Sequence, residues 1–215
     1  MKGRYAGCHM TTYGSILPGA VSIARWANQT QSLTVKAKWR LRIMVHINIE
    51  IKAKSKNQEQ IRKILKSRKA DFKGVDHQID TYFKVNFGRL KLRQGEIENH
   101  LIYYQRENKQ GPKQSDVVLF KSDPKSSLKE ILTKALGILV VVDKKREIYF
   151  IDNVKFHIDT VKKLGTFVEI EAIDSGGTIG KAKLLAQCQF YLDLFKISQK
   201  DLISVSYSDL LLEKK

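Results

Sequence analysis

The sequence predicts an α+β fold in which eight antiparallel strands close into a barrel or tunnel and the helices pack against its outside. Short segments that alternate between aliphatic and polar residues recur along the chain, and a period of two is typical of strands. Only three segments show helical spacing, too few for a fold built from β-α-β units. The strand count therefore favours an antiparallel barrel or tunnel.

The first predicted strand begins at Val45 and carries a charged face. Aliphatic residues at 47, 49 and 51 lie on one side of it, and Asn48, Glu50 and Lys52 lie on the other. Ser55 is then expected to cap a helix, whose apolar residues recur at helical spacing up to an end at Gly74.

The remaining elements follow from the same patterns. Further strands are predicted at residues 78–84, 89–93, 100–106, 117–121, 138–142, 144–151, 154–158 and 166–173. A second helix should run from Asp123 and Pro124 to Gly137, and a last one from about 179 to 195.

Composition narrows the classes of partner. The 215 residues carry a formal net charge of +17, which implies an anionic partner: a nucleic acid, an acidic membrane or a phosphorylated small molecule. No run of about 18 apolar residues exists, so we expect a soluble, cytoplasmic protein without a membrane-spanning helix. Cys8 and Cys188 are far apart and share no ligand spacing with a histidine, which argues against a zinc site or a disulfide framework.

Residues 1–43 differ from the rest of the chain. The first acidic residue is Glu50, and the preceding segment is basic or neutral and rich in Ser and Thr. This composition resembles an organellar transit peptide, which would place the protein in an organelle. The alternative is a disordered tail or upstream extension before a natural start at Met44. Either way, the folded domain is expected at residues 44–215.

Charges alternate with aliphatic residues on five of the predicted strands, which leaves two interpretations. The charged faces either form a solvated outer surface around an apolar interior, or they line the interior while helices cover the aliphatic faces. Unpaired ions in a closed lumen cost several kcal/mol each. A lumen containing both signs of charge is therefore best explained by a bound polyphosphate and bound metal.

The two charge types then have separate expected roles. Arginine binds phosphate oxygens through paired N–H groups and lysine as a point charge, and the predicted phosphate-binding residues are Lys52, Lys91, Arg93, Arg106, Lys144 and Arg146. Carboxylates suit Mg²⁺ or Mn²⁺, and the predicted metal ligands are Glu50, Asp159, Glu169 and Glu171. Because Glu169 and Glu171 are two residues apart on a strand, both can reach the same metal.

Six segments in order resemble one known family. They are Asn48-Ile-Glu-Ile-Lys52, Gln78-Ile-Asp-Thr-Tyr-Phe83, Gly88-Arg-Leu-Lys-Leu-Arg93, Leu101-Ile-Tyr-Tyr-Gln-Arg106, Lys144-Lys-Arg-Glu-Ile-Tyr-Phe150 and Gly165-Thr-Phe-Val-Glu-Ile-Glu171. Together they resemble the CYTH superfamily, the triphosphate tunnel metalloenzymes, and within it the class IV adenylate cyclase-like (CyaB-like) branch. The segment Ser206-Tyr-Ser-Asp-Leu-Leu211 is similar to the Ser-Tyr segment near the end of that family's domain.

The resemblance implies an eight-stranded tunnel that binds a triphosphate along its axis and acts on it with a divalent metal. We predict Lys52, Arg146 and His157 as catalytic residues, with His157 as a general base or ligand; a structural, hydrogen-bonded histidine is the alternative. The family signature Glu-x-Glu-x-Lys departs here at Asn48, whose amide oxygen is a weaker metal ligand.

The reaction remains open between two outcomes. Attack by a ribose 3′-hydroxyl at the α-phosphorus gives cyclic AMP, whereas attack by water at the terminal phosphorus makes the protein a triphosphatase. A non-catalytic nucleotide or polyphosphate-binding protein is one alternative. Nucleic-acid binding is another, but the basic residues alternate with aliphatic ones inside strands instead of forming an exposed stripe with aromatics, which argues against it.

Overall fold

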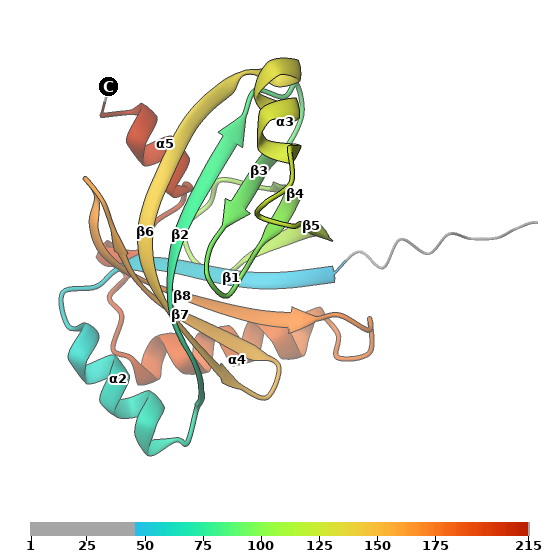
Figure 1. The fold of residues 1–215 in the computed structure, drawn as a ribbon. Coiled ribbons are helices and arrows are strands. Elements are labelled where there is room, and N and C mark those ends of the chain that lie inside the picture. Colours follow the sequence, from blue (N-terminus) through green and yellow to red (C-terminus); the bar gives the residue numbers. More distant parts are fainter. Residues whose placement is uncertain (1–45, 215) are drawn as a thin grey trace, which may run out of the picture. The chain divides into compact units, whose positions relative to one another are not determined.

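The computed structural model describes residues 46–214, which contain an eight-stranded closed barrel. The elements are β1 (His46–Lys54), α2 (Gln58–Ser67), β2 (Asp71–Phe83), β3 (Arg89–Gln94), β4 (His100–Arg106), β5 (Lys113–Lys121), α3 (Leu128–Leu136), β6 (Ile138–Ile151), β7 (Val154–Val161), β8 (Gly165–Asp174), α4 (Lys181–Leu194), the 3-10 turn η1 (Gln199–Asp201) and α5 (Tyr207–Leu212). Figure 1 shows the strands curving around a common interior. The predicted α+β barrel is confirmed.

The strands follow the order β1-β5-β4-β3-β2-β6-β7-β8, and each neighbouring pair is antiparallel. Closure pairs β1 with both β5 and β8. Since side chains alternate between the two faces of a strand, closure sends one complete set of alternating side chains into the lumen. Closure also removes the free sheet edges that would otherwise expose unpaired backbone groups.

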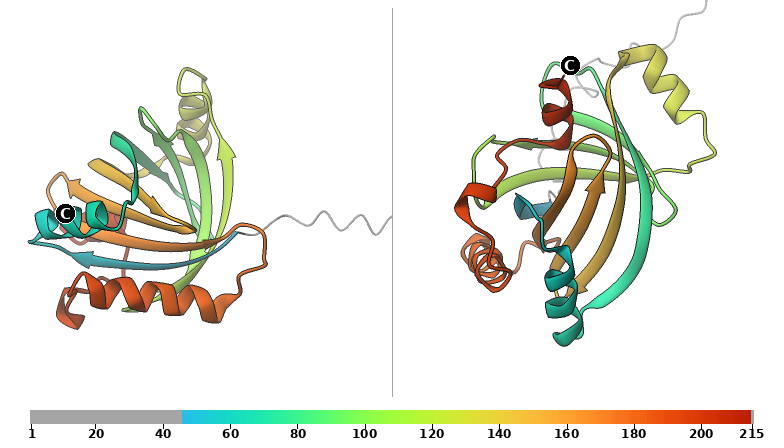
Figure 2. Two further views of the ribbon diagram at one scale, coloured as in Figure 1. Left: turned by 90° about the horizontal axis from the view of Figure 1, so that it is seen from below. Right: turned by 90° about the vertical axis from the view of Figure 1, so that its left-hand side faces the viewer.

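Helices α2 and α4 cover only part of the barrel's outside. Helix α4 lies against β1 and β8, and Figure 2 shows it running across that wall. The core between helices and wall is aliphatic and aromatic, and it includes Ile49, Ile51, Leu65, Phe156, Ile170, Leu184 and Cys188. This packing takes up the aliphatic faces of β1, β7 and β8. Their other faces, which carry the charges, therefore point into the lumen.

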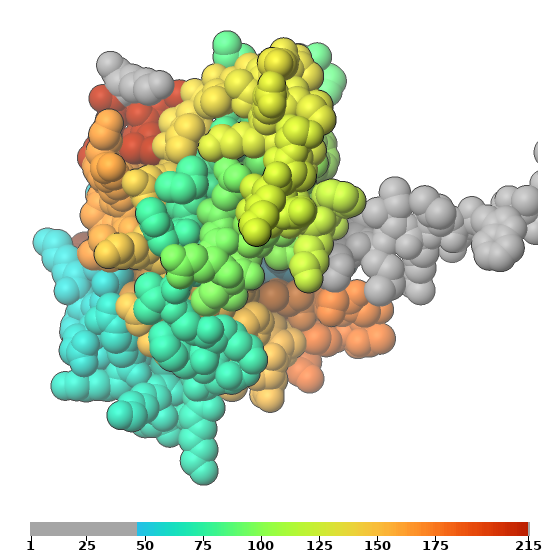
Figure 3. Space-filling view, in the orientation of Figure 1, coloured from blue at the N-terminus to red at the C-terminus, as the bar shows by residue number. Residues whose placement is uncertain are grey.

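The two remaining helices differ from this pattern. No residue of α3 is buried, and the space-filling view shows α3 at the surface (Figure 3). Helix α5 begins with a capping box in which the Ser206 side chain accepts a hydrogen bond from the Asp209 backbone and the Asp209 carboxylate accepts one from the Ser206 backbone. This cap fixes the orientation of Tyr207, which contacts the lumen side of the barrel.

Several predicted boundaries were wrong. Helix α2 ends at Ser67 and not at Gly74: Lys69 has a φ of 56°, and its neighbour Ala70 donates a hydrogen bond to the Leu65 carbonyl. Gly74 instead lies within β2, with a φ of 124° beside a register shift after Phe72, where glycine's conformational freedom is needed.

The sheet also differs in detail from the prediction. Residues 138–151 form one strand, β6, where two segments were predicted, because Asp143 continues the ladder opposite Ile79. Strand β5 begins at Lys113, four residues earlier than expected, and helix α5 was not predicted. The predicted extension at residues 1–43 lies outside the described residues. Among residues 46–214, no helix has both the length and the apolar character needed to cross a membrane.

Candidate active site in the barrel lumen

The barrel contains a cavity that opens partly to solvent, and its empty space, with the open part included, amounts to about 990 Å³. Among the described residues, seven Lys or Arg and five Asp or Glu line it: Lys52, Lys91, Arg93, Arg106, Lys144, Arg146, Lys155, Glu50, Asp80, Glu98, Glu169 and Glu171. The interpretation in which the charged strand faces line the interior therefore describes this barrel. Basic residues exceed acidic ones, so the lumen favours an anion.

Asp80 on β2 pairs with three of these cations. Its carboxylate accepts hydrogen bonds from Lys91 Nζ at 2.9 Å, Lys144 Nζ at 2.6 Å and Arg93 Nε at 2.9 Å. Burial alone would raise the pKa of Asp80, but the surrounding positive charges hold it well below its usual range. Asp80 is therefore an anion at neutral pH, and it holds the three cations in one place.

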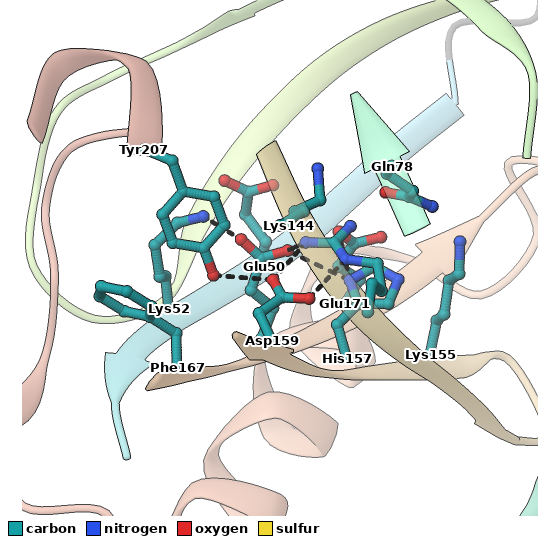
Figure 4. Close-up of polar contacts among 12 residues, drawn as sticks. Glu50, Lys52, Gln78, Lys144, Lys155, His157, Asp159, Phe167, Glu171 and Tyr207 are labelled. Atoms are coloured by element: carbon teal, nitrogen blue, oxygen red, sulfur yellow. Dashed lines mark hydrogen bonds and ion pairs between the residues drawn. The ribbon is translucent and has the colours of Figure 1, made fainter. Parts of the chain in front are cut away.

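Arg146 on β6 forms a second charged group with two carboxylates. It donates to both oxygens of Asp159, at 2.7 and 2.6 Å, and to Glu169 Oε2 at 2.7 Å. Tyr207 also donates to Asp159 Oδ2, at 2.8 Å. Figure 4 shows this arrangement, with Tyr207 and Lys52 on one side of the cluster. Both Asp159 oxygens are thus engaged, and Asp159 positions Arg146.

A third group of side chains has the composition of a metal site. One ligand atom from each of His157, Glu169 and Glu171 lies within 4.8 Å of the others. His157 Nδ1 is 3.1 Å from Glu169 Oε2 and 3.5 Å from Glu171 Oε1. Burial and the Arg146 guanidinium lower the pKa of His157, so its imidazole is neutral at neutral pH.

The neighbouring strand adds further oxygen donors. Glu50 on β1 lies directly opposite Glu171 on β8, and like charges in this position destabilise a sheet unless a cation separates them. Arg106 pairs with Glu50, and Glu171 keeps its carboxylate toward the cavity. Asn48 Oδ1 is buried and has no hydrogen-bond partner among the described residues. These hard oxygen donors fit a divalent cation such as Mg²⁺ or Mn²⁺.

Every predicted phosphate-binding residue lines the cavity, and so do three of the four predicted metal ligands; these nine are Lys52, Lys91, Arg93, Arg106, Lys144, Arg146, Glu50, Glu169 and Glu171. The fourth predicted ligand, Asp159, is fully buried behind Arg146 and does not line the cavity. His157 is also buried, behind Glu169 and Glu171, so it reaches these carboxylates and not the open space.

Four residues of the site have no role among the sequence-based predictions. Asp80 and Lys155 lie on lumen-facing positions of β2 and β7, where the alternation that identified Lys91 or Arg146 could have found them. Glu98 lies in the β3–β4 loop, and Tyr207 follows the barrel. No periodic pattern identifies these two, because their places depend on how a loop and a terminal helix fold back.

Lys113 on β5 shows how strongly desolvation in this interior affects a charged group. It is 1% exposed, and its Nζ donates to the Ile203 and Ser204 carbonyls at 2.9 and 3.2 Å. Burial, with the nearby charges of Arg106 and Lys52, lowers the pKa of Lys113 from 10.5 to about 7.

The stability of the protein should therefore depend on pH through Lys113. Between pH of about 7 and 10.5 the unfolded chain binds more protons at this group than the folded protein, so the free energy of unfolding should rise with pH across that window. Below about 7 both states are protonated and the contribution is constant. Urea unfolding of Lys113→Met should lose this rise, while Lys121→Met, at an exposed position on β5, should keep it. If the free energy of unfolding varied with pH in the same way for the native protein and both variants, the prediction would be contradicted.

Comparisons with solved structures show the same fold elsewhere. The PH1012 protein of Pyrococcus horikoshii is 24% identical, with a TM-score of 0.62 over 76% of this chain and 98% of that chain. A Vibrio parahaemolyticus protein, proposed to be an adenylate cyclase, is 16% identical, with a TM-score of 0.61 over 77% of this chain and 98% of that chain.

A third structure has a stated activity. This Hippeastrum protein, proposed to be an adenylyl cyclase and reported to have a dominant triphosphatase activity, is 15% identical. Its TM-score is 0.55, over 79% of this chain and 96% of that chain. At these identities the likeness shows the fold alone, and no curated protein matches the sequence. The model of the CYTH domain matches residues 46–196, more than half of the 215 residues, and the chain therefore belongs to the CYTH domain family.

Proposed function

We propose that this protein is a divalent-metal-dependent enzyme that hydrolyses a triphosphate held in the barrel lumen. The observation that carries the proposal is the joint presence, in one cavity, of six predicted phosphate-binding cations and of opposed carboxylates on β1 and β8. Phosphoryl transfer needs mainly positioning and charge stabilisation, and this lumen offers both.

The basic residues would bind the phosphate oxygens. Lys91, Arg93 and Lys144 converge on Asp80, so their donors already lie close together before a ligand arrives. Asp159 orients the guanidinium of Arg146 from behind, and Tyr207 in turn donates a hydrogen bond to Asp159. Such preorganisation lowers the entropic cost of binding and keeps the donors aimed at charge that develops during the reaction.

The carboxylates would hold the metal. Glu50, Glu169 and Glu171, with the Asn48 amide oxygen nearby, supply oxygen donors, and His157 orients Glu169 and Glu171 from its buried position. When bound there, a divalent ion would offset negative charge on the phosphate oxygens. This arrangement favours a positioning role for His157 over contact with the substrate.

Hydrolysis is the reaction that the lining supports best. Water attacks the terminal phosphorus, the bridging P–O bond breaks, and orthophosphate and a diphosphate leave. Cyclisation would also need a pocket that stacks an adenine ring, but the aromatic residues that line the cavity, Tyr82, Tyr104 and Tyr207, are all buried among the charged groups. The triphosphatase activity reported for the Hippeastrum protein of the same fold agrees with this choice.

A product assay tests the proposal. The purified protein is incubated with Mg²⁺ or Mn²⁺ and, separately, with ATP, thiamine triphosphate and inorganic tripolyphosphate, and the products are resolved by chromatography. We expect orthophosphate release that stops when a chelator removes the metal. Cyclic AMP with pyrophosphate would identify a cyclase instead, and no product from any substrate would leave a binding protein without turnover.

A further inference from the structure

The two ends of the cavity differ in exposure and in chemistry. At one end, here called the closed end, Lys52, Tyr104 and Tyr207 are 7%, 8% and 4% exposed. At the other, here called the open end, Leu119 is 49% exposed and lies with Glu98, His100, Lys155 and Ile173 in the lining. Figure 4 shows Lys155 on the side of the cluster opposite Tyr207. A ligand that fills the lumen must therefore emerge at the open end.

Glu98 lies at the open end among groups that could also bind a phosphate. Its Oε2 accepts hydrogen bonds from Arg93 Nη1 at 2.8 Å and Gln78 Nε2 at 3.0 Å, and its Oε1 pairs with Lys155. Two cations and an amide donor around one anionic group are also what a phosphate needs. The positive charges of Arg93 and Lys155 hold the pKa of Glu98 below its usual range despite burial, so Glu98 remains charged.

The loop that carries Glu98 is fixed by a second carboxylate. Asp76, which is fully buried, accepts hydrogen bonds from the backbone N–H groups of Glu96, Ile97 and Glu98 at 2.6, 3.0 and 3.0 Å. A side chain at Gly95 would place its Cβ 2.6 Å from the Asp76 oxygens, so the loop closes over Asp76 only with glycine there. The charge of Glu98 is therefore built into the open end and does not depend on a mobile side chain.

The open end also carries apolar and uncharged side chains. Leu119 and Ile173 line it together with Asn48 and His100. Such a surface accommodates an organic group, whereas the carboxylate of Glu98 repels an anion in the same place.

From this geometry we infer that Glu98 is a specificity-determining residue that disfavours ligands carrying a further phosphate at the open end. The inference rests on the proposed function, since it assigns the substrate class of the same site. A further phosphate at the open end would meet the carboxylate of Glu98, which Arg93, Gln78 and Lys155 hold in place.

The test compares two ligands that differ by one phosphate. Calorimetry measures the Kd of ATP and of adenosine 5′-tetraphosphate, each without added metal so that the ligand is not hydrolysed, for the native protein, Glu98→Gln and Glu98→Asp. Glu107→Gln, an exposed residue outside the cavity, is the matched control. Thermal unfolding of each variant checks that it is folded.

We expect the native protein and the control to prefer ATP. In Glu98→Gln the preference should shift toward the tetraphosphate by at least about tenfold, which corresponds to about 1.4 kcal/mol. Glu98→Asp keeps the charge and should keep the native preference. If Glu98→Gln bound both ligands more tightly by the same factor, the inference would be overturned and the proposed function would stand. Failure of the native protein to bind either nucleotide would overturn the inference alone if the protein still released orthophosphate from tripolyphosphate, and would overturn both if it released none from any of the three substrates.

Discussion

Replacing Glu171 with glutamine should reduce metal-dependent hydrolysis by more than about 100-fold, since losses of about 10–100-fold already follow when only the outer partners of metal ligands are changed. Glu171 is the most informative position for this test. Its carboxylate lines the cavity, faces Glu50 across β1 and β8, and lies 3.5 Å from His157 Nδ1. The amide keeps the size of the side chain but removes the charge that would hold the metal.

Glu169→Gln should lose activity as well, but for two reasons that cannot be separated in that variant. Glu169 pairs with Lys52 and Arg146, so its neutralisation also leaves buried cations without a partner. The double variant Glu169→Gln/Glu171→Gln is expected to be inactive and less stable. Glu130→Gln, on exposed helix α3, serves as the control. Steady-state rates over a range of Mg²⁺ concentrations give the readout, and full activity in Glu171→Gln would show that the metal is held elsewhere.

Asp80→Asn should lower the free energy of unfolding by about 3–5 kcal/mol, the usual cost of removing one partner from a buried ion pair. Lys91, Arg93 and Lys144 would then be left near one another with no carboxylate between them. Because an added polyphosphate can replace the missing negative charge, tripolyphosphate should stabilise this variant more than it stabilises the native protein.

Urea unfolding with and without tripolyphosphate measures both effects. Asp116→Asn, at an exposed position on β5, is the control and should behave like the native protein in both conditions. If Asp80→Asn were as stable as the control, the three lumen cations would be hydrated and would not need the carboxylate of Asp80 to offset their charge. If tripolyphosphate stabilised the two variants equally, the three cations would not bind phosphate.

The barrel and the orientation of its charged faces could be predicted because both depend on local pattern. Alternation at Glu50 and Lys52, and again at Lys144 and Arg146, has a period that only a strand satisfies, and one apolar face must pack against something. The resemblance to the CYTH family placed the same residues in a tunnel.

Which carboxylate pairs with which cation could not be predicted, because that depends on strand register around a closed barrel. Asp80 meets Lys144 although 64 residues separate them, and Lys52 meets Glu169 across 117. Asp159 was expected to bind metal, yet the register of β6 and β7 sets it opposite Arg146. Tyr207 enters the site from a terminal helix whose short sequence has no strong period.

The central claim, that the lumen binds a triphosphate through its basic residues with a metal held by the carboxylates, is tested most directly by calorimetric titration with tripolyphosphate. The native protein should show saturable binding that Mg²⁺ strengthens, and Lys91→Met, which removes one lumen cation while Arg93 and Lys144 still pair with Asp80, should bind at least about tenfold more weakly. Absence of saturable binding, or binding unchanged by both the metal and the variant, would contradict the account.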